Sequence, residues 1–222
     1  ESVSGANSAE RFQTWGLALE HAWSARTHAV VALDWLNSEA SRRIGAYQHA
    51  PLNAFTFPRI FPTDTAQRLD FAERNLTLAL HQLVGAEWAL GARYRISDAE
   101  LDSSSPEFPV NNPAITGVRR AEHREATLHQ VHLHLIYNHP VGVFSQAGAL
   151  WAGQDNRGER SPSDEDFWQF NLLAGYRFPR RQAEVRVGVL NVTGQDYRLN
   201  PLNLTADLPR ERTFMASLRF SL

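Results

Sequence analysis

The sequence contains no cysteine, which excludes disulfide bonds, thiolate metal sites and a cysteine nucleophile. It has no run of about 18 apolar residues, so a membrane-spanning helix is not expected. A membrane β-barrel would lack such a run too, because its apolar residues are interleaved with polar ones, so the negative mean hydropathy does not exclude one. The net charge of −2 gives no electrostatic case for nucleic acid as a partner. The chain starts at Glu1 without an apolar signal segment, so a signal peptide, if one existed, has been removed or lies upstream.

What the sequence does contain is strict alternation of apolar and polar residues. In the last stretch, Arg212 to Leu222, every second side chain is apolar and the others are mostly polar, which is the period of a β-strand with one apolar face. A terminal strand of this kind is typical of bacterial outer-membrane β-barrels, where it serves as the assembly signal. The residues expected to form that signal are Phe214, Leu218, Phe220 and Leu222.

Eight earlier segments repeat this pattern, and short connections alternate with long ones. Such asymmetry is typical of barrels with short periplasmic turns and long extracellular loops. All prolines fall in the predicted turns, loops or flanks, and all six tryptophans fall on the apolar face near a predicted strand end, as two aromatic belts would require. The long breaks are predicted at 37–68, 98–124, 154–165 and 193–211. The predicted strands are Arg11–Trp23, Thr27–Leu36, Leu69–Leu83, Glu87–Ser97, Glu125–Tyr137, Val141–Gly153, Asp166–Phe178, a strand around Val185–Val189, and Arg212–Leu222.

Alternation alone does not say whether the apolar face points outward to lipid or inward to a dry core. A soluble lipocalin-like barrel or a sandwich would bury that face. Predicted strands of about 10 to 13 residues are longer than those of soluble sheets, and aromatic residues at both strand ends suit lipid headgroups, so we favour the membrane barrel. The expected fold is therefore an all-β, antiparallel, up-and-down transmembrane β-barrel.

Counting strands from a periplasmic C-terminus leaves the first of about nine strands starting outside the cell. Bacterial single-chain barrels have even strand numbers and periplasmic termini. We therefore expect residues 1–222 to be one barrel segment, the C-terminal part of a longer barrel, unless a strand near residues 40–65 has been missed. The only candidate for that strand is Tyr47 to Phe57, which Pro51 makes a poor one.

The segment from Leu190 to Tyr197, Leu-Asn-Val-Thr-Gly-Gln-Asp-Tyr, resembles the asparagine-centred motif near the penultimate strand of TonB-dependent receptor barrels. Further on, Pro209, Arg210 and the segment from Arg212 to Phe214 resemble the entry to the final strand of these receptors. The resemblance implies uptake of a small solute of the iron-chelate, cobalamin or glycan class. The sequence contains neither a plug domain nor an energy-coupling box, so an energy-coupling partner would act through a missing N-terminal region.

Charged and aromatic residues on the expected lumen face and in the first loop are the candidate ligand-binding residues. Histidines at alternate strand positions can share a metal ion, but no carboxylate stands at ligand spacing beside them, so ordinary hydrogen bonding is favoured and no metal site or other cofactor is predicted. For the first loop, simple loop packing is an equal alternative. A barrel phospholipase is not favoured, because Ser145 falls on the lipid face. The candidates are Arg93, Arg95, His132, His134, Arg177, Arg186, Tyr47 and Phe57.

These patterns together predict a non-enzymatic transporter or receptor barrel of the bacterial outer membrane. Its expected partners are the lipid bilayer, the barrel assembly machinery, an energy-coupling protein and a small-molecule ligand, with no nucleic acid. Two alternatives remain open at this point. One is a passive porin-like or polysaccharide-export channel, and the other is a soluble β-barrel that binds a ligand.

Overall fold

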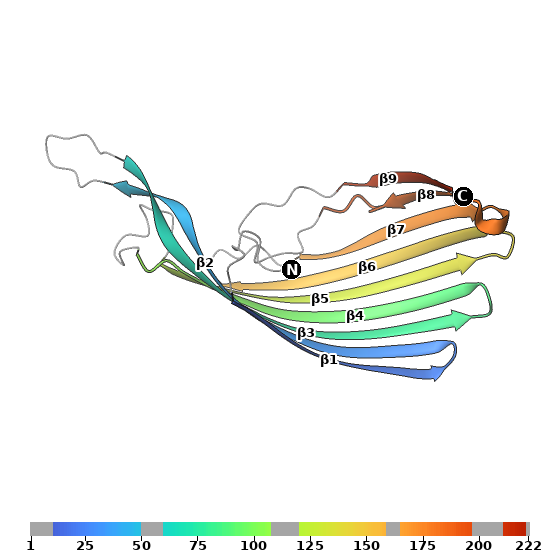
Figure 1. Ribbon diagram of the computed structural model, residues 1–222, viewed down its shortest axis with the longest axis horizontal. Coiled ribbons are helices and arrows are strands. Elements are labelled where there is room, and N and C mark those ends of the chain that lie inside the picture. The colour runs from blue at the N-terminus through green and yellow to red at the C-terminus, as the bar shows by residue number, and fades with distance from the viewer. Residues whose placement is uncertain (1–10, 50–59, 108–119, 159–164, 197–210, 221–222) are drawn as a thin grey trace.

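The computed structural model describes residues 11–49, 60–107, 120–158, 165–196 and 211–220. These residues form one nine-stranded antiparallel sheet in which each strand pairs with the next along the chain (Figure 1). The strands are β1 (Arg11–Ser24), β2 (Thr27–His49), β3 (Ile60–Val84), β4 (Trp88–Ser104), β5 (Ala121–Asn138), β6 (Val143–Gly158), β7 (Glu165–Arg177), β8 (Ala183–Leu190) and β9 (Thr213–Phe220). The only helical element in these ranges is a short 3-10 turn, η1 (Pro179–Arg181).

The pairing register gathers the alternating side chains into two continuous faces. Leu33 lies opposite Leu76, and Leu76 lies opposite Ile96, so the apolar positions of successive strands meet across the sheet. We call this side the apolar face, and the side that carries Asn75 and Arg93 the polar face. The all-β, up-and-down, antiparallel fold predicted from the alternation is confirmed. Within the described residues the sheet is not closed, because β1 and β9 each have one free edge.

The two faces differ in how far their side chains are buried. The apolar face is exposed, with Trp15 64% and Leu172 51% accessible. A single sheet buries side chains where it curves around them, so this sheet curls around its polar face. The buried strand residues all lie on that polar face: Ala40, Ala46, Thr65, Leu69, Asn75, Ser97, Leu101, Ala126, Phe144, Ala152, Gln154 and Phe167.

Most strands are longer than their alternation indicates. The predicted breaks at 37–68 and 98–124 are wrong at both ends, because β2 runs to His49, β3 starts at Ile60, β4 runs to Ser104 and β5 starts at Ala121. The break at 154–165 is likewise shortened by β6, which runs to Gly158. In these extensions the alternation changes phase, because acidic residues such as Glu100 and Asp102 take the apolar-face positions while Ala40 and Leu101 are buried on the other face. The alternation of short and long connections is still present.

One smaller expectation is wrong for the same reason, and another is only partly covered by the described residues. Pro62 lies within β3, opposite Tyr47, although no proline was expected in a strand. It is tolerated because β4 pairs with β3 only from Arg68 onward, so at Pro62 one side of β3 has no strand partner. The segment proposed as a missed strand is not separate, since residues 47–49 end β2 and residues 50–57 lie outside the described residues.

The tryptophans lie on the apolar face as expected, but not all near strand ends. Trp35 and Trp151 fall in the middle of β2 and β6, because those strands extend well beyond them. Figure 1 shows the β2–β3 hairpin extending beyond the other strands. No helix in the described ranges is long and apolar enough to cross a membrane.

Candidate functional site

The apolar face carries a band without any charged side chain across all nine described strands. No Asp, Glu, Lys or Arg occurs at its apolar-face positions, and we call this the uncharged band. Arg93, Arg95 and Arg186 occur within the same strand segments and Arg177 directly follows one of them, but all four lie on the polar face. The uncharged band comprises the apolar-face positions of residues 15–23, 27–35, 76–84, 88–96, 129–137, 143–151, 168–176, 185–189 and 214–220.

Aromatic residues line both margins of this band. Trp88 packs against Tyr137 with ring centroids 4.4 Å apart at the margin near the short turns. On β1, Trp15 and Trp23 mark the two margins eight residues apart, and Trp168 and Tyr176 do the same on β7. At about 3.3 Å per residue, this spacing corresponds to roughly 26 Å along the strand. The margin far from the turns carries Trp15, Trp35, Tyr94, Trp151 and Trp168, and the margin near them carries Trp23, Trp88, Tyr137, Tyr176, Phe178 and Phe220.

On the same side of the sheet, the residues beyond the margin far from the turns are polar and mainly acidic. We call this region the charged collar. A groove of about 520 Å³ runs through part of it, between β1 and β4. The charged collar includes Glu39, Asp70, Asp98, Glu100, Asp102, Glu125 and Asp155, with Arg11, Arg74, His123 and Arg157 among them.

His123 is held between acids in the collar. Its Nδ1 lies 2.7 Å from Asp102 Oδ1 and its Nε2 lies 3.0 Å from Glu125 Oε1. Hydrogen bonds to Glu125 and Asp102 favour the charged imidazolium and raise the pKa of His123 to about 9. Glu100, Asp102 and His123 also bring their ligand atoms within 4.8 Å of one another. All three are exposed, and the proton on each ring nitrogen competes with any metal ion.

Of the arginines proposed to bind ligand, Arg95 already contacts polar residues of the neighbouring strand β3. Its Nη2 donates to Asn75 Oδ1 at 2.8 Å and lies 3.3 Å from Glu73 Oε1. Ser97 Oγ donates to the same Asn75 oxygen at 2.5 Å. This network joins β3 to β4 and leaves Arg95 with few donors for a ligand.

Arg177 and Arg186 also form hydrogen bonds within the sheet, and they lie at the end of the sheet near the short turns. Arg177 Nε donates to Glu184 Oε2 at 3.0 Å, and Nη1 donates to Asn138 Oδ1 at 2.8 Å. The same guanidinium lies 4.1 Å from the centre of the Phe144 ring. Arg186 Nε donates to the serine hydroxyl opposite it on β9 at 2.7 Å. These two arginines are therefore separated from the histidines of β5.

Arg93, His132 and His134 are brought together on the polar face. Arg93 lies directly opposite His132 across the β4–β5 pair and remains exposed. His134 lies opposite Gly91, and its ring centroid is 5.4 Å from that of His81. Sequence reasoning missed His81, and with it His28, which pairs with His81 across β2 and β3. Their grouping depends on strand register, which spacing within one strand does not reveal.

The remaining proposed residues are only partly described. The side chain of Tyr47 and the whole of Phe57 lie outside the described residues, as does Leu222 of the expected assembly signal. The other signal residues, Phe214, Leu218 and Phe220, lie on the apolar face of β9 and are exposed. Ser145 lies on the apolar face between Tyr137 and Ala174, so neither cross-strand neighbour offers it a base.

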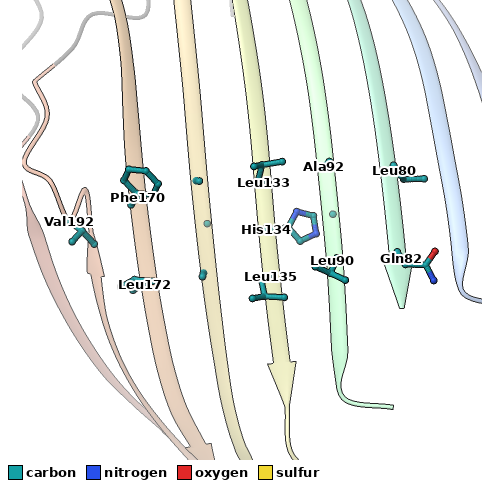
Figure 2. A pocket seen from close by; sticks show the side chains of 14 residues that line it. Leu80, Gln82, Leu90, Ala92, Leu133, His134, Leu135, Phe170, Leu172 and Val192 are labelled. Carbon is teal, nitrogen blue, oxygen red and sulfur yellow. The ribbon is translucent and has the colours of Figure 1, made fainter. Parts of the chain in front are cut away.

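The apolar face has an open hollow of about 670 Å³, at a place where small side chains lie next to large ones. Figure 2 shows Leu133 and Leu135 on β5 and Phe170 and Leu172 on β7 at its sides. Ala147 and Ala149 on β6 lie between these pairs. Its lining is almost wholly hydrocarbon, so an apolar chain is the chemistry that it can accommodate.

The asparagine-centred segment forms a compact turn directly after β8. Asn191 has a positive φ of 51° and is buried, and its side-chain Oδ1 accepts from Gln195 N at 2.9 Å. Its Nδ2 donates to Gln195 O at 2.8 Å, and its backbone N–H donates to Asn171 Oδ1 at 2.8 Å. Asparagine is one of the few residues that tolerates this backbone conformation while its side chain closes the turn.

No known family model matches the chain, and no curated protein is significantly similar to it. The functional assignment therefore depends on the two faces of the sheet. The apolar face is suited to hydrocarbon contact between two aromatic margins. The polar face offers arginine, histidine and amide groups that can bind a polar solute or line a wet passage.

Proposed function

We propose that this chain forms part of the wall of an outer-membrane β-barrel that serves as a solute transporter or receptor. The observation that carries the proposal is the uncharged band, bounded on both sides by aromatic residues. Placing one Arg or Lys at the middle of a bilayer costs about 2 to 4 kcal/mol, whereas a sheet face in water bears no such penalty. A band free of charge across nine strands is what that penalty selects for.

The height of the band supports the same proposal. Strands of transmembrane barrels tilt by about 35 to 45° and present an apolar region about 25 Å tall. The spacing of roughly 26 Å along the strand becomes about 20 Å after such a tilt, which is close to that height. Tryptophan and tyrosine at both margins suit the headgroup level on each side.

The soluble-binder alternative requires the apolar face to be buried. In the described residues that face is exposed, and the buried strand residues lie on the opposite face. A soluble protein with such a patch would be prone to associate. This contrast favours the membrane barrel over the soluble barrel.

Within that proposal, the resemblance of Leu190–Tyr197 and of the entry to β9 points to the TonB-dependent receptors. The hydrogen-bonded turn at Asn191 gives this motif a structural reason, since its side chain ends β8 and redirects the chain. The substrate class then comprises iron chelates, cobalamin or glycans. The second candidate is a passive channel, favoured by the exposure of Arg93 on the polar face.

Cell fractionation and purification test the membrane part of the proposal. The full-length protein is expected in the outer-membrane fraction, to need detergent for extraction, and to show heat-modifiable mobility on gels. A water-soluble monomer with sharp two-state unfolding would contradict it.

Conductance across planar bilayers then separates the two membrane candidates. A receptor barrel is expected to remain closed until it is energised, whereas a passive channel conducts steadily. Steady single-channel conductance from the intact protein would replace the receptor proposal with the channel.

A further inference from the structure

Three histidines from different strands lie in one transverse row on the polar face. His28 on β2 pairs with His81 on β3, and the row continues through Gly91 on β4 to His134 on β5. The rings of His81 and His134 have centroids 5.4 Å apart and are tilted by 41°. Side chains directly opposite in an antiparallel pair have Cβ atoms about 4.5 to 5.5 Å apart, so His28 is also within reach of His81.

Gly91 makes this arrangement possible. A Cβ atom at position 91 would lie 1.9 Å from Cε1 and 2.2 Å from Nε2 of His134, which is far inside any permitted contact. The imidazole of His134 therefore occupies the place where a side chain of β4 would stand. Figure 2 shows this ring beside β4, at a level between Leu133 and Leu135. By crossing β4 it approaches His81, although their strands are two spacings of about 4.8 Å apart.

We propose that His81 and His134, with His28 beside them, bind a divalent transition-metal ion on the polar face. Neutral imidazole is a common ligand for Zn²⁺, Ni²⁺, Cu²⁺ and Co²⁺. Two imidazoles on one tetrahedral ion, with metal–nitrogen bonds of about 2.0 to 2.1 Å, have ring centroids roughly 5 Å apart. The observed separation of the two rings, 5.4 Å, is close to that value.

The surroundings define the kind of site. The row continues to Gly148 on β6, which leaves space beside His134, and then to Asn171 on β7, whose Oδ1 already accepts from Asn191 N. Two or three imidazole ligands leave coordination positions for water or for donors of an incoming chelator. The site therefore binds the ion without enclosing it. The proposal depends on the polar face alone, so it and the membrane assignment can fail separately.

Cobalt titration of the intact, purified protein tests the site, because Co²⁺ bound to imidazole in a tetrahedral site has a characteristic visible absorption. All variants carry Glu100→Gln and Asp102→Asn, which removes the exposed ligand group of the collar from the measurement. We expect this background to bind Co²⁺ with that spectrum, and Zn²⁺ to displace it. His81→Ala and His134→Ala should each weaken binding at least tenfold, while His21→Ala, outside the row on the apolar face, should leave it unchanged.

Two glycines of the same row provide a matched pair. Gly91→Ala places its methyl group in the His134 ring and should weaken Co²⁺ binding although every ligand is retained. Gly148→Ala meets only Leu133 O at 3.9 Å and should bind as the background does. If Gly91→Ala fails to fold, His134→Gln takes its place and should abolish the spectrum. Absence of tetrahedral Co²⁺ binding, or equal affinity in the His81→Ala, His134→Ala and background proteins, would overturn the proposal.

Discussion

At the residue scale, the backbone conformation at Asn191 explains why the motif has asparagine at this position. Its φ of 51° favours Asn or Gly, and its side chain makes two hydrogen bonds to Gln195. We expect Asn191→Ala to lower the free energy of unfolding by roughly 1 to 3 kcal/mol, because both the backbone preference and the side-chain bonds are lost. Asn191→Gly retains the backbone freedom and should lose less. Denaturant titration of both variants in lipid or detergent measures this, and equal stability of Asn191→Ala and the wild type would refute it.

His123 gives a prediction for pH dependence. Its folded pKa of about 9 lies above the ordinary value of 6.5, so the imidazolium pairing contributes its full stabilisation below about pH 6.5 and loses it as the pH rises through 9. Glu125→Gln should move the pKa of His123 back toward 6.5. Glu122→Gln, which removes the partner of Arg124 instead, should leave it unchanged. NMR titration of the imidazole measures both variants, and a wild-type pKa near 6.5 would contradict the paired geometry.

Residue roles were the least predictable part of the candidate site. Sequence periodicity correctly put Arg93, Arg95, His132 and His134 on the same face, because residues two positions apart along a strand point to the same side of the sheet. It did not reveal that Arg95 is engaged by Asn75 and Glu73, or that His134 reaches His81 across a glycine, because those contacts depend on register between strands.

At the element scale, periodicity located the strands where the outer face is apolar and failed where the apolar residues change to the opposite face. The turns after β1 and β3 were predictable because the alternation continues almost to the last residues of these strands, Ser24 and Val84. The extensions of β2 and β4 carry collar residues such as Glu39 and Asp102 on the apolar-face side and buried Ala40 and Leu101 on the other, so the alternation continues in reversed phase. Hydrogen bonds of the backbone continue these strands across the change of phase, which a search for one continuous apolar face misses.

A pair of arginine substitutions on neighbouring strands tests the assignment of the two faces. Leu172 lies on the apolar face opposite Ala147, and Gln146 is the adjacent residue of β6 on the polar face. We expect Leu172→Arg to cost about 2 to 4 kcal/mol in a bilayer, because the charge would lie in hydrocarbon. Gln146→Arg should cost much less, since that side chain is exposed on the polar face. Refolding titrations into lipid vesicles compare the two, and equal large losses would indicate that the polar face is a dry core.

At the scale of the whole molecule, the described sheet is an open wall with nine strands. Strands β1 and β9 run in the same direction because every neighbouring pair is antiparallel. In hydrocarbon both free edges must be paired, either with each other or with further strands of the assembled protein. The sequence predicted this wall from its repeated alternation, and the outward apolar face that strand length and aromatic placement favoured agrees with the curl of the sheet around its polar face.

The most direct test of the central claim is a spin-label scan along β7, which the lack of cysteine makes possible without background. Single cysteines at positions 169 to 175 of the full-length protein in lipid are labelled, and collisions with oxygen and with a water-soluble nickel complex are measured. At Phe170, Leu172 and Ala174 we predict high oxygen and low nickel accessibility, with the reverse at Gln169 and Asn171. Loss of this alternation, or nickel access at Leu172, would contradict the assignment of the uncharged band to lipid.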